Sequence, residues 1–162
     1  MISPAAQPLF MEFAAKPLLI LHALFAMALL GSTTHDAILC IGFLRGRFGR
    51  RKLERIYALI ASCCYAATFL VGSILYPTYR VRVRAAYFDR ALPWASNLFD
   101  VKENWAAIGL AASLGLLLLS RSVEPQRERF IVPLYAFLSI TACAIAWFAT
   151  ISGLVLASYR AV

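Results

Sequence analysis

Two histidines and one aspartate are the residues of this sequence whose side chains could do chemistry inside an apolar run. His22, His35 and Asp36 lie between Pro17 and Leu44, in a stretch dominated by leucine, alanine and isoleucine. An imidazole can ligate haem iron, and a buried imidazole or carboxylate can carry a proton. The chemistry of this region therefore depends on what lies across from these three side chains.

The spacing of the two histidines excludes a haem held by both of them within this chain. His35 follows His22 by 13 residues, which corresponds to roughly 20 Å along a helix axis and about 220° around it. One b-type haem would take His22 or His35 on one side, and a methionine, an open position or another subunit's histidine on the other. His35 is favoured, because Ala28, Gly31 and Gly42 lie near its face and leave room for a flat ring.

Three interpretations of this polar region stay open. In the first, His35 and Asp36 bond to polar groups of other helices and fix the packing of a larger complex. In the second, His35 or His22 binds a b-type haem. In the third, His35 and Asp36 handle protons or ions. Thr33 and Thr34 are expected to be buried, with hydroxyls that bond back to carbonyls one turn earlier.

The composition points to a membrane environment. Of the 162 residues, 62% are hydrophobic and 15% are charged, and the mean hydropathy is +0.74, far from the balance of soluble domains. Runs of about 20 apolar residues match a hydrocarbon core of roughly 30 Å. We therefore expect an all-α membrane protein that forms a single membrane domain over residues 1–162.

Four transmembrane helices must position the polar residues. The hydrophobic runs predict them at about 17–44, 56–76, 105–119 and 130–159. Short connections favour an up-and-down bundle of these helices.

The segment 77–104, between the second and third helices, is predicted to be an interfacial amphipathic segment on the outer membrane surface. Aromatic residues alternate with charged residues along it, as an interfacial segment requires. Arg80, Arg82, Arg84 and Trp94 are expected to contact lipid or a partner, because guanidinium groups bind phosphate and carboxylate oxygens.

Four polar residues directly precede Trp105 at the outer end of the third predicted helix: Asp100, Lys102, Glu103 and Asn104. They would either line an entrance for protons or quinone, or lie solvated at the level of the lipid headgroups.

Small residues at four-residue spacing predict close helix contacts in two of the helices. Such residues share one helix face and let a neighbouring helix approach. The third helix carries Ala107, Ala111 and Gly115, and the fourth carries Ala142, Ala146 and Thr150.

The basic residues predict the orientation and the partners. The loops around 45–55 and 121–129 are rich in arginine, so we expect them to face the cytoplasm and both termini to lie on the opposite side. The net charge of +8 is concentrated beside hydrophobic runs, which favours lipid headgroups and other membrane subunits over nucleic acid as partners. A bacterial inner membrane fits this composition.

The sequence contains no motif of an enzyme or of a known metal site. Its four cysteines, Cys40, Cys63, Cys64 and Cys143, lie in apolar runs without a C-x-x-C pattern, so they predict packing and no zinc, iron–sulfur or covalent haem site. No hydrolase or nucleotide-binding motif is present. The chain is therefore not expected to be an enzyme by itself.

Two functions agree with these observations. The first is a small integral-membrane subunit of a larger energy-transducing or electron-transfer complex. Its contribution would be mainly structural, with one side of a b-haem or quinone site as a further role. The alternative is a homo-oligomeric proton or small-solute transporter that uses His35 and Asp36.

Overall fold

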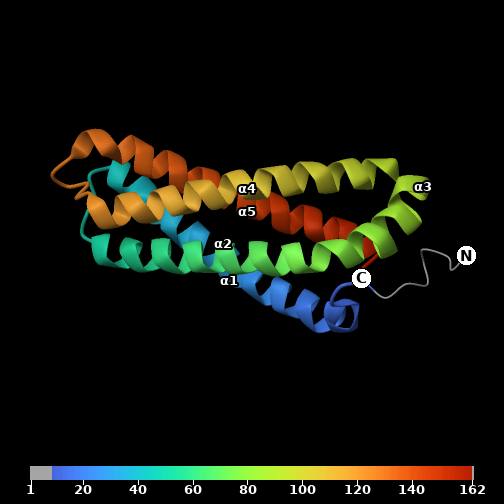
Figure 1. Cartoon of the computed structure of the whole chain (residues 1–162). Coiled ribbons are helices and arrows are strands. Elements are labelled where there is room, and N and C mark those ends of the chain that lie inside the picture. The colour runs from blue at the N-terminus through green and yellow to red at the C-terminus, as the bar shows by residue number, and fades with distance from the viewer. Residues whose placement is uncertain (1–8, 162) are drawn as a thin grey trace, which may run out of the picture.

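The structure is a computed structural model that describes residues 9–161, and it contains helices and no strand within that range. Residues 1–8 and 162 of the predicted domain lie outside the described residues. Four long helices dominate (Figure 1): α1 (Ala15–Leu44), α2 (Arg51–Tyr79), α4 (Pro93–Ser122) and α5 (Val132–Tyr159). Each of the four is long and apolar enough to cross a membrane.

The third helix differs most from its expected bounds. The helices predicted at 17–44 and 130–159 agree with α1 and α5 to within two residues at each end. The helix expected at 105–119 is instead α4, which begins at Pro93. Proline suits the first turn of a helix because its missing N–H would have no partner there.

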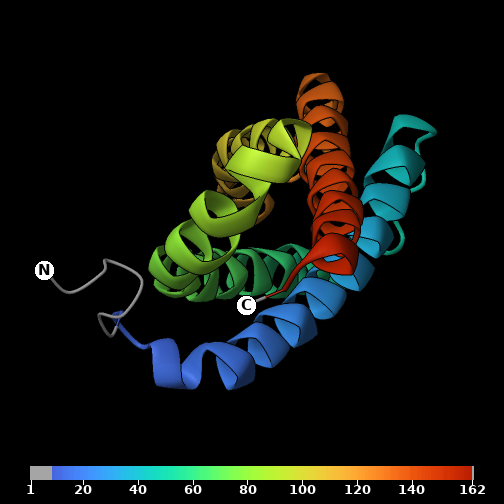
Figure 2. The same ribbon diagram turned by 90° about the vertical axis from the view of Figure 1, so that its right-hand side faces the viewer.

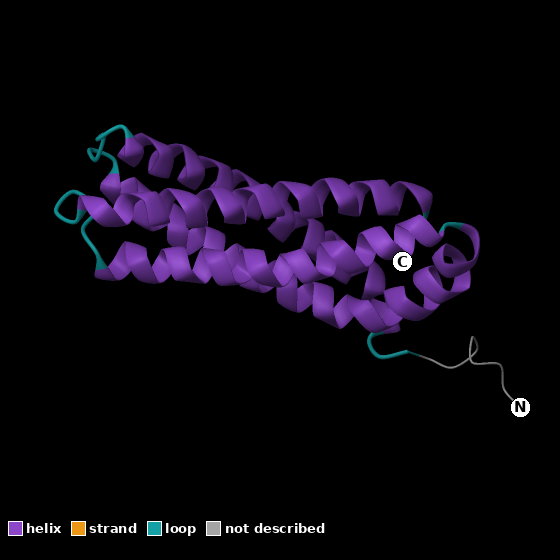
Figure 3. Ribbon diagram, turned by 90° about the horizontal axis from the view of Figure 1, so that it is seen from above, coloured by secondary structure: helices purple, strands orange, loops and turns teal. Residues whose placement is uncertain are grey.

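The segment 77–104 also differs from its expected form, because it is continuous with the helices on both sides. α2 continues without interruption into a π-helix, η3 (Arg80–Phe88), and then into α3 (Asp89–Ala91), so that only Leu92 separates this long helix from α4 (Figure 3). The segment is a helical hairpin whose apolar side chains pack against each other and are buried: Val83, Phe88, Ala95 and Phe99. It is therefore part of two long helices and not a separate segment between them; its position at the outer membrane surface stays a prediction.

Glycine ends α1 and allows the short connection to α2. Gly46 has a φ of 73°, in the left-handed region that glycine adopts without steric cost. The Gly46 N–H donates to the Phe43 carbonyl at 2.9 Å, and the Arg47 N–H donates to the Gly42 carbonyl at 3.0 Å. These bonds close the last turn and reverse the chain.

The four long helices pack as a ring. α1 contacts α2 and α5, and α4 contacts the same two helices, so the order around the ring is α1, α2, α4, α5 (Figure 2). The 45–50 and 123–128 connections lie at one end, which we call the loop end. The start of α1, the end of α5 and α3 lie at the other, which we call the hairpin end (Figure 1).

Many small and polar side chains face the inside of the ring, beside a few large ones such as Phe43 and Tyr135, and many large apolar side chains face outward. Ser62 Oγ lies 3.0 Å from the Ser113 carbonyl and 3.1 Å from its hydroxyl, which joins α2 to α4. Ile38, Leu118 and Leu154 are 63–68% exposed. This distribution is typical of helices that pack in lipid, where small residues bring backbones together.

Only some of the small residues at four-residue spacing lie where helices contact each other. Ala142 and Ala146 of α5 are buried in the interior, whereas Ala107 and Ala111 of α4 are exposed. The close approach on α4 occurs at Gly109. Gly115 is half-buried, and a Cβ atom there would lie 3.6 Å from Leu138 of α5, so the spacing selected one of the three α4 residues correctly.

Replacement of Gly109 by alanine should destabilise the fold. A Cβ atom at Gly109 would lie 1.9 Å from the Tyr65 Oη atom and 2.9 Å from the Ile145 Cγ2 atom, so these buried side chains or the helices that carry them must shift. We expect the free energy of unfolding to fall by about 1–3 kcal/mol, the usual cost of overpacking. Gly153→Ala is the matched control, because nothing lies within 4 Å of that Cβ position. Circular dichroism during denaturation in detergent measures both, and equal stability of the two variants would contradict the packing.

Candidate functional site

Two arginines of α2 bind the end of α4: Arg55 donates from Nε to the Ser120 carbonyl at 3.1 Å, and Arg51 makes the larger set of contacts. Arg51 begins α2, and its Nη2 atom donates to the Ser120 and Val123 carbonyls, each at 2.7 Å, and to the Tyr135 hydroxyl at 2.9 Å. The last carbonyls of a helix lack partners within that helix, and a positive charge there is favourable. The guanidinium therefore joins α2 to the end of α4 and to α5.

The same guanidinium neutralises a buried glutamate. Glu54 is fully buried, and its Oε2 atom accepts hydrogen bonds from Arg51 Nη1 and from Ser120 Oγ. A carboxylate out of contact with water is tolerated only when it is paired and hydrogen-bonded. Arg51 provides the opposite charge and a hydrogen bond, and Ser120 provides a second hydrogen bond.

Asp36 lies beside Glu54 inside the ring. It is 1% exposed, and its Oδ2 atom accepts hydrogen bonds from Ser139 Oγ at 2.6 Å and from Cys40 Sγ at 3.9 Å. Ligand atoms of Asp36, Cys40 and Glu54 all lie within 4.8 Å of one another. We call Asp36, Cys40, Arg51, Glu54 and Ser139 the buried carboxylate cluster; it joins α1, α2 and α5.

The two threonines bond to the backbone of their own helix. Thr33 is 2% exposed, and its hydroxyl donates to the Leu29 carbonyl at 2.8 Å. Thr34 is half-buried; its hydroxyl donates to the Leu30 carbonyl at 2.7 Å and accepts from Trp147 Nε1 at 3.1 Å. Thr34 therefore also contacts α5.

His35 lies on the outside of the ring. Its side chain is exposed, its ring stacks on Tyr57 of α2 with centroids 5.1 Å apart, and its Nδ1 atom lies 2.8 Å from the Gly31 carbonyl. Adjacent helical residues point about 100° apart, so His35 and Asp36 face different surroundings. Of the two, only Asp36 finds polar partners inside this chain's ring; for His35, contact with another subunit stays a prediction.

His22 packs against α2 near the hairpin end. It is half-buried, and a Cβ atom at Gly72 would lie 3.2 Å from the His22 Cε1 atom. The absence of a side chain at Gly72 makes room for this imidazole.

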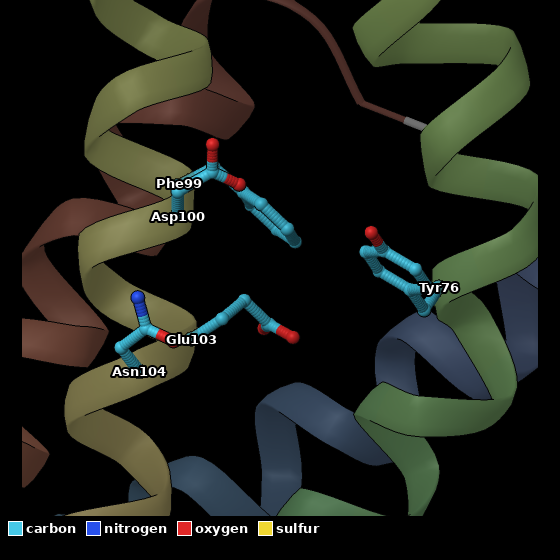
Figure 4. Close-up of a pocket in the computed structure, with 5 residues that line it drawn as sticks. All are labelled: Tyr76, Phe99, Asp100, Glu103 and Asn104. Carbon is cyan, nitrogen blue, oxygen red and sulfur yellow. The ribbon is translucent and has the colours of Figure 1, made fainter.

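The hairpin end contains a pocket of about 400 Å³ between α2 and α4 (Figure 4). It is lined by Tyr76, Phe99, Asp100, Glu103 and Asn104. Three of the four polar residues that precede Trp105 thus line this pocket; whether they form an entrance or lie solvated among headgroups stays open. The fourth, Lys102, places its ammonium 4.9 Å from the centre of the Phe99 ring.

Two of the arginines expected to contact lipid or a partner bind carboxylates of this chain. Arg82 donates to Glu12 at 2.7 Å, and Arg84 donates to both oxygens of Asp100 at 2.6 and 2.9 Å. Arg80 is exposed. Trp94 is also exposed, with its ring 5.4 Å from that of Tyr159. For Arg80 and Trp94, contact with lipid or a partner stays a prediction.

The sequence analysis missed Arg51, Glu54 and Ser139. One signal was available: Glu54 is the only acidic residue among the bases of 45–55, so a specific partner for it could have been suspected. Serine is too common in apolar helices to single out Ser139, because its hydroxyl can bond to its own helix.

The residues described above can bind ligands in two different ways. Two buried carboxylates beside one guanidinium can hold a proton or a cation, and an exposed imidazole can ligate a metal or haem. No protein family model, no curated protein and no solved structure matches the chain.

Removal of Arg51 should destabilise the fold far more than removal of its neighbour Arg55. Arg51→Ala leaves Glu54 charged and buried, which costs about 3–5 kcal/mol. Arg55 pairs with Glu124, and both side chains are at least 40% exposed, so Arg55→Ala should cost about 1 kcal/mol or less. Denaturation in detergent compares the two variants.

A double variant separates the loss of the ion pair from a general loss of folding. Arg51→Ala combined with Glu54→Gln removes the charge of Glu54 along with its partner, so it should recover part of the stability lost in Arg51→Ala. Equal losses in the two arginine variants, or no recovery in the double variant, would show that the ion pair is not a main support of the fold.

Proposed function

We propose that the protein is an integral-membrane subunit of a larger energy-transducing or electron-transfer complex. The four long apolar helices support insertion in a membrane, and the large exposed apolar side chains suit contact with lipid. The arginine-rich loop end would face the cytoplasm of a bacterial cell, and the hairpin end, with both chain termini, the opposite side.

The exposed imidazole of His35 is the observation that carries this proposal. His35 precedes Arg45, at the loop end of α1, by ten residues, about 15 Å along that helix, so it would lie within the membrane, level with Tyr57 of α2. A polar side chain at that depth is costly when it faces lipid. A partner subunit over His35 and Tyr57 would remove this cost, so we place the contact with the partner on this face of α1 and α2.

The hydrogen bond of the His35 ring suits it to ligate a haem. The Gly31 carbonyl can only accept, so the Nδ1 atom 2.8 Å away carries the hydrogen and the neutral ring keeps its lone pair on Nε2. Metal-ligating histidines are commonly oriented by such a bond to a backbone carbonyl. Nε2 of His35 would therefore bind a b-type haem, or accept a hydrogen bond from a quinol, between this chain and its partner.

Spectra and composition of the gently solubilised protein test this proposal. Wild-type protein purified with its partners should show a Soret band that is lost in His35→Ala. The matched control is His22→Ala, because His22 packs inside against Gly72 and should leave the band unchanged. A colourless preparation that retains its partner subunits would contradict the haem role, and a homo-oligomer without partners would contradict the subunit proposal.

A second candidate function is supported by the buried carboxylate cluster. A homo-oligomeric proton or small-solute transporter would use Asp36, as expected from the sequence, but with Glu54 in place of His35. Each of these carboxylates has one buried oxygen without a hydrogen-bond partner among the described residues: Asp36 Oδ1 and Glu54 Oε1. Buried intramembrane carboxylates commonly mark proton paths.

Proton flux into vesicles tests the transporter. The purified chain alone, in vesicles with a trapped pH indicator, should dissipate an imposed pH gradient, and Asp36→Asn should reduce the rate at least tenfold. Glu124→Gln is the control, because Glu124 is exposed at the loop end. Rates equal to those of empty vesicles would argue against transport.

A further inference from the structure

Asp36, Cys40 and Glu54 form a compact triad of metal-ligating side chains. Asp36 and Cys40 are four residues apart on α1 and so share one helix face, while Glu54 lies in the first turn of α2. Each is at most 1% exposed. One ligand atom from each residue lies within 4.8 Å of the other two. The triad therefore brings two hard oxygen donors and one soft sulfur donor to a single point.

The two carboxylates each use only one oxygen. Asp36 Oδ2 accepts from Ser139 and Cys40, and Glu54 Oε2 accepts from Arg51 and Ser120. Asp36 Oδ1 and Glu54 Oε1 are buried and have no hydrogen-bond partner within the described residues. Unpaired buried carboxylate oxygens are costly, so two of them in one triad point to a ligand.

The charge of the triad fits a divalent cation. With both carboxylates ionised and Cys40 as a thiolate, the triad carries three negative charges, and Arg51 supplies one positive charge. A dication brings this buried group to neutrality. A single proton would bring the net charge of the two carboxylates and Arg51 to zero. Cys40 would then stay a thiol and have no role in binding.

The geometry and the donor types match zinc. Three atoms no more than 4.8 Å apart have a common centre within about 2.8 Å of each, the side of the triangle divided by √3. Zinc bonds are about 2.0–2.3 Å long, so side-chain movements of about 0.5–0.8 Å at most close the site. Thiolate selects zinc over magnesium or calcium.

We propose that Asp36, Cys40 and Glu54 bind one zinc ion that links α1 to α2 near the loop end. Binding converts the Cys40 thiol to a thiolate, and its proton passes to the solvent as the metal–sulfur bond forms. Ser139 and Arg51 orient the two carboxylates from outside the metal shell, as hydrogen-bond partners of metal ligands do. A fourth position of the tetrahedral ion is left for water. This proposal is independent of the subunit proposal; it competes with the transporter proposal, because both use Asp36 and Glu54.

Cobalt substitution tests the site directly. The full-length protein in detergent, stripped of metal with a chelator, is titrated with Co²⁺, which gives a thiolate-to-cobalt charge-transfer absorption when sulfur is a ligand. We expect one Co²⁺ per chain, an intense band, and displacement by Zn²⁺. Cys40→Ser should abolish the band. Cys63→Ser is the matched control, because Cys63 is exposed elsewhere on α2, and it should keep the band.

The carboxylate ligands and the zinc content provide a second measurement. Asp36→Asn and Glu54→Gln should each weaken Co²⁺ binding at least tenfold, with circular dichroism used to verify folding. Wild-type protein purified without added metal should contain about one zinc per chain, and Cys40→Ser much less. Chelation should lower the melting temperature of the wild type but not that of Cys40→Ser.

Three results would overturn the zinc site. A charge-transfer band of equal strength in wild type and Cys40→Ser would assign the metal to other residues. Equal zinc content in the two proteins would indicate an adventitious ion only. Absence of any Co²⁺ band in folded wild-type protein, together with an infrared carboxylic-acid signal that Asp36→Asn removes, would show that the two carboxylates share a proton instead.

Discussion

The guanidinium of Arg51 at the end of α4 is the contact on which the rest of the structure depends. Small side chains in the ring allow helices to approach each other, but they do not select which faces meet. Arg51 has that selectivity, because it must reach the Ser120 and Val123 carbonyls, Tyr135 and Glu54 at once. Asp36 extends the polar contacts to α1, where it lies beside Glu54. All four helices are thus aligned by polar groups close to the loop end.

The hairpin end is held by different contacts and is more open. Its ion pair between Arg84 and Asp100 is partly exposed, so it stabilises less than a buried pair with matched partners. Tyr79 and Phe99 stack with ring centroids 4.1 Å apart, and the pocket lies beside them. The molecule therefore has one end fixed by buried charges and one end where a ligand or a partner can enter between α2 and α4.

The sequence predicted the features that depend on long apolar runs. It did not predict the features that depend on contacts between helices. Apolar runs of sufficient length predicted four helices because hydropathy is averaged over many residues. The charges of 77–104 suggested a surface segment, since nothing in the sequence shows that Arg84 pairs with Asp100. The outward direction of His35 was also hidden, because α1 is apolar on all sides. The triad of Asp36, Cys40 and Glu54 needs two helices brought together, so no spacing along the chain could reveal it.

The π-helix η3 makes one stretch of the chain unusually tolerant of a change in length. A π-helical turn contains about one residue more than an α-helical turn, because its hydrogen bonds span five residues. Deletion of one residue within Arg80–Phe88 could be absorbed by a return to α-helical turns, with α4 kept in register. The same deletion earlier in α2 would rotate every later side chain of that helix by about 100°. Variation in length during evolution, or an engineered insertion, is therefore best accommodated at the hairpin end, far from the buried carboxylate cluster.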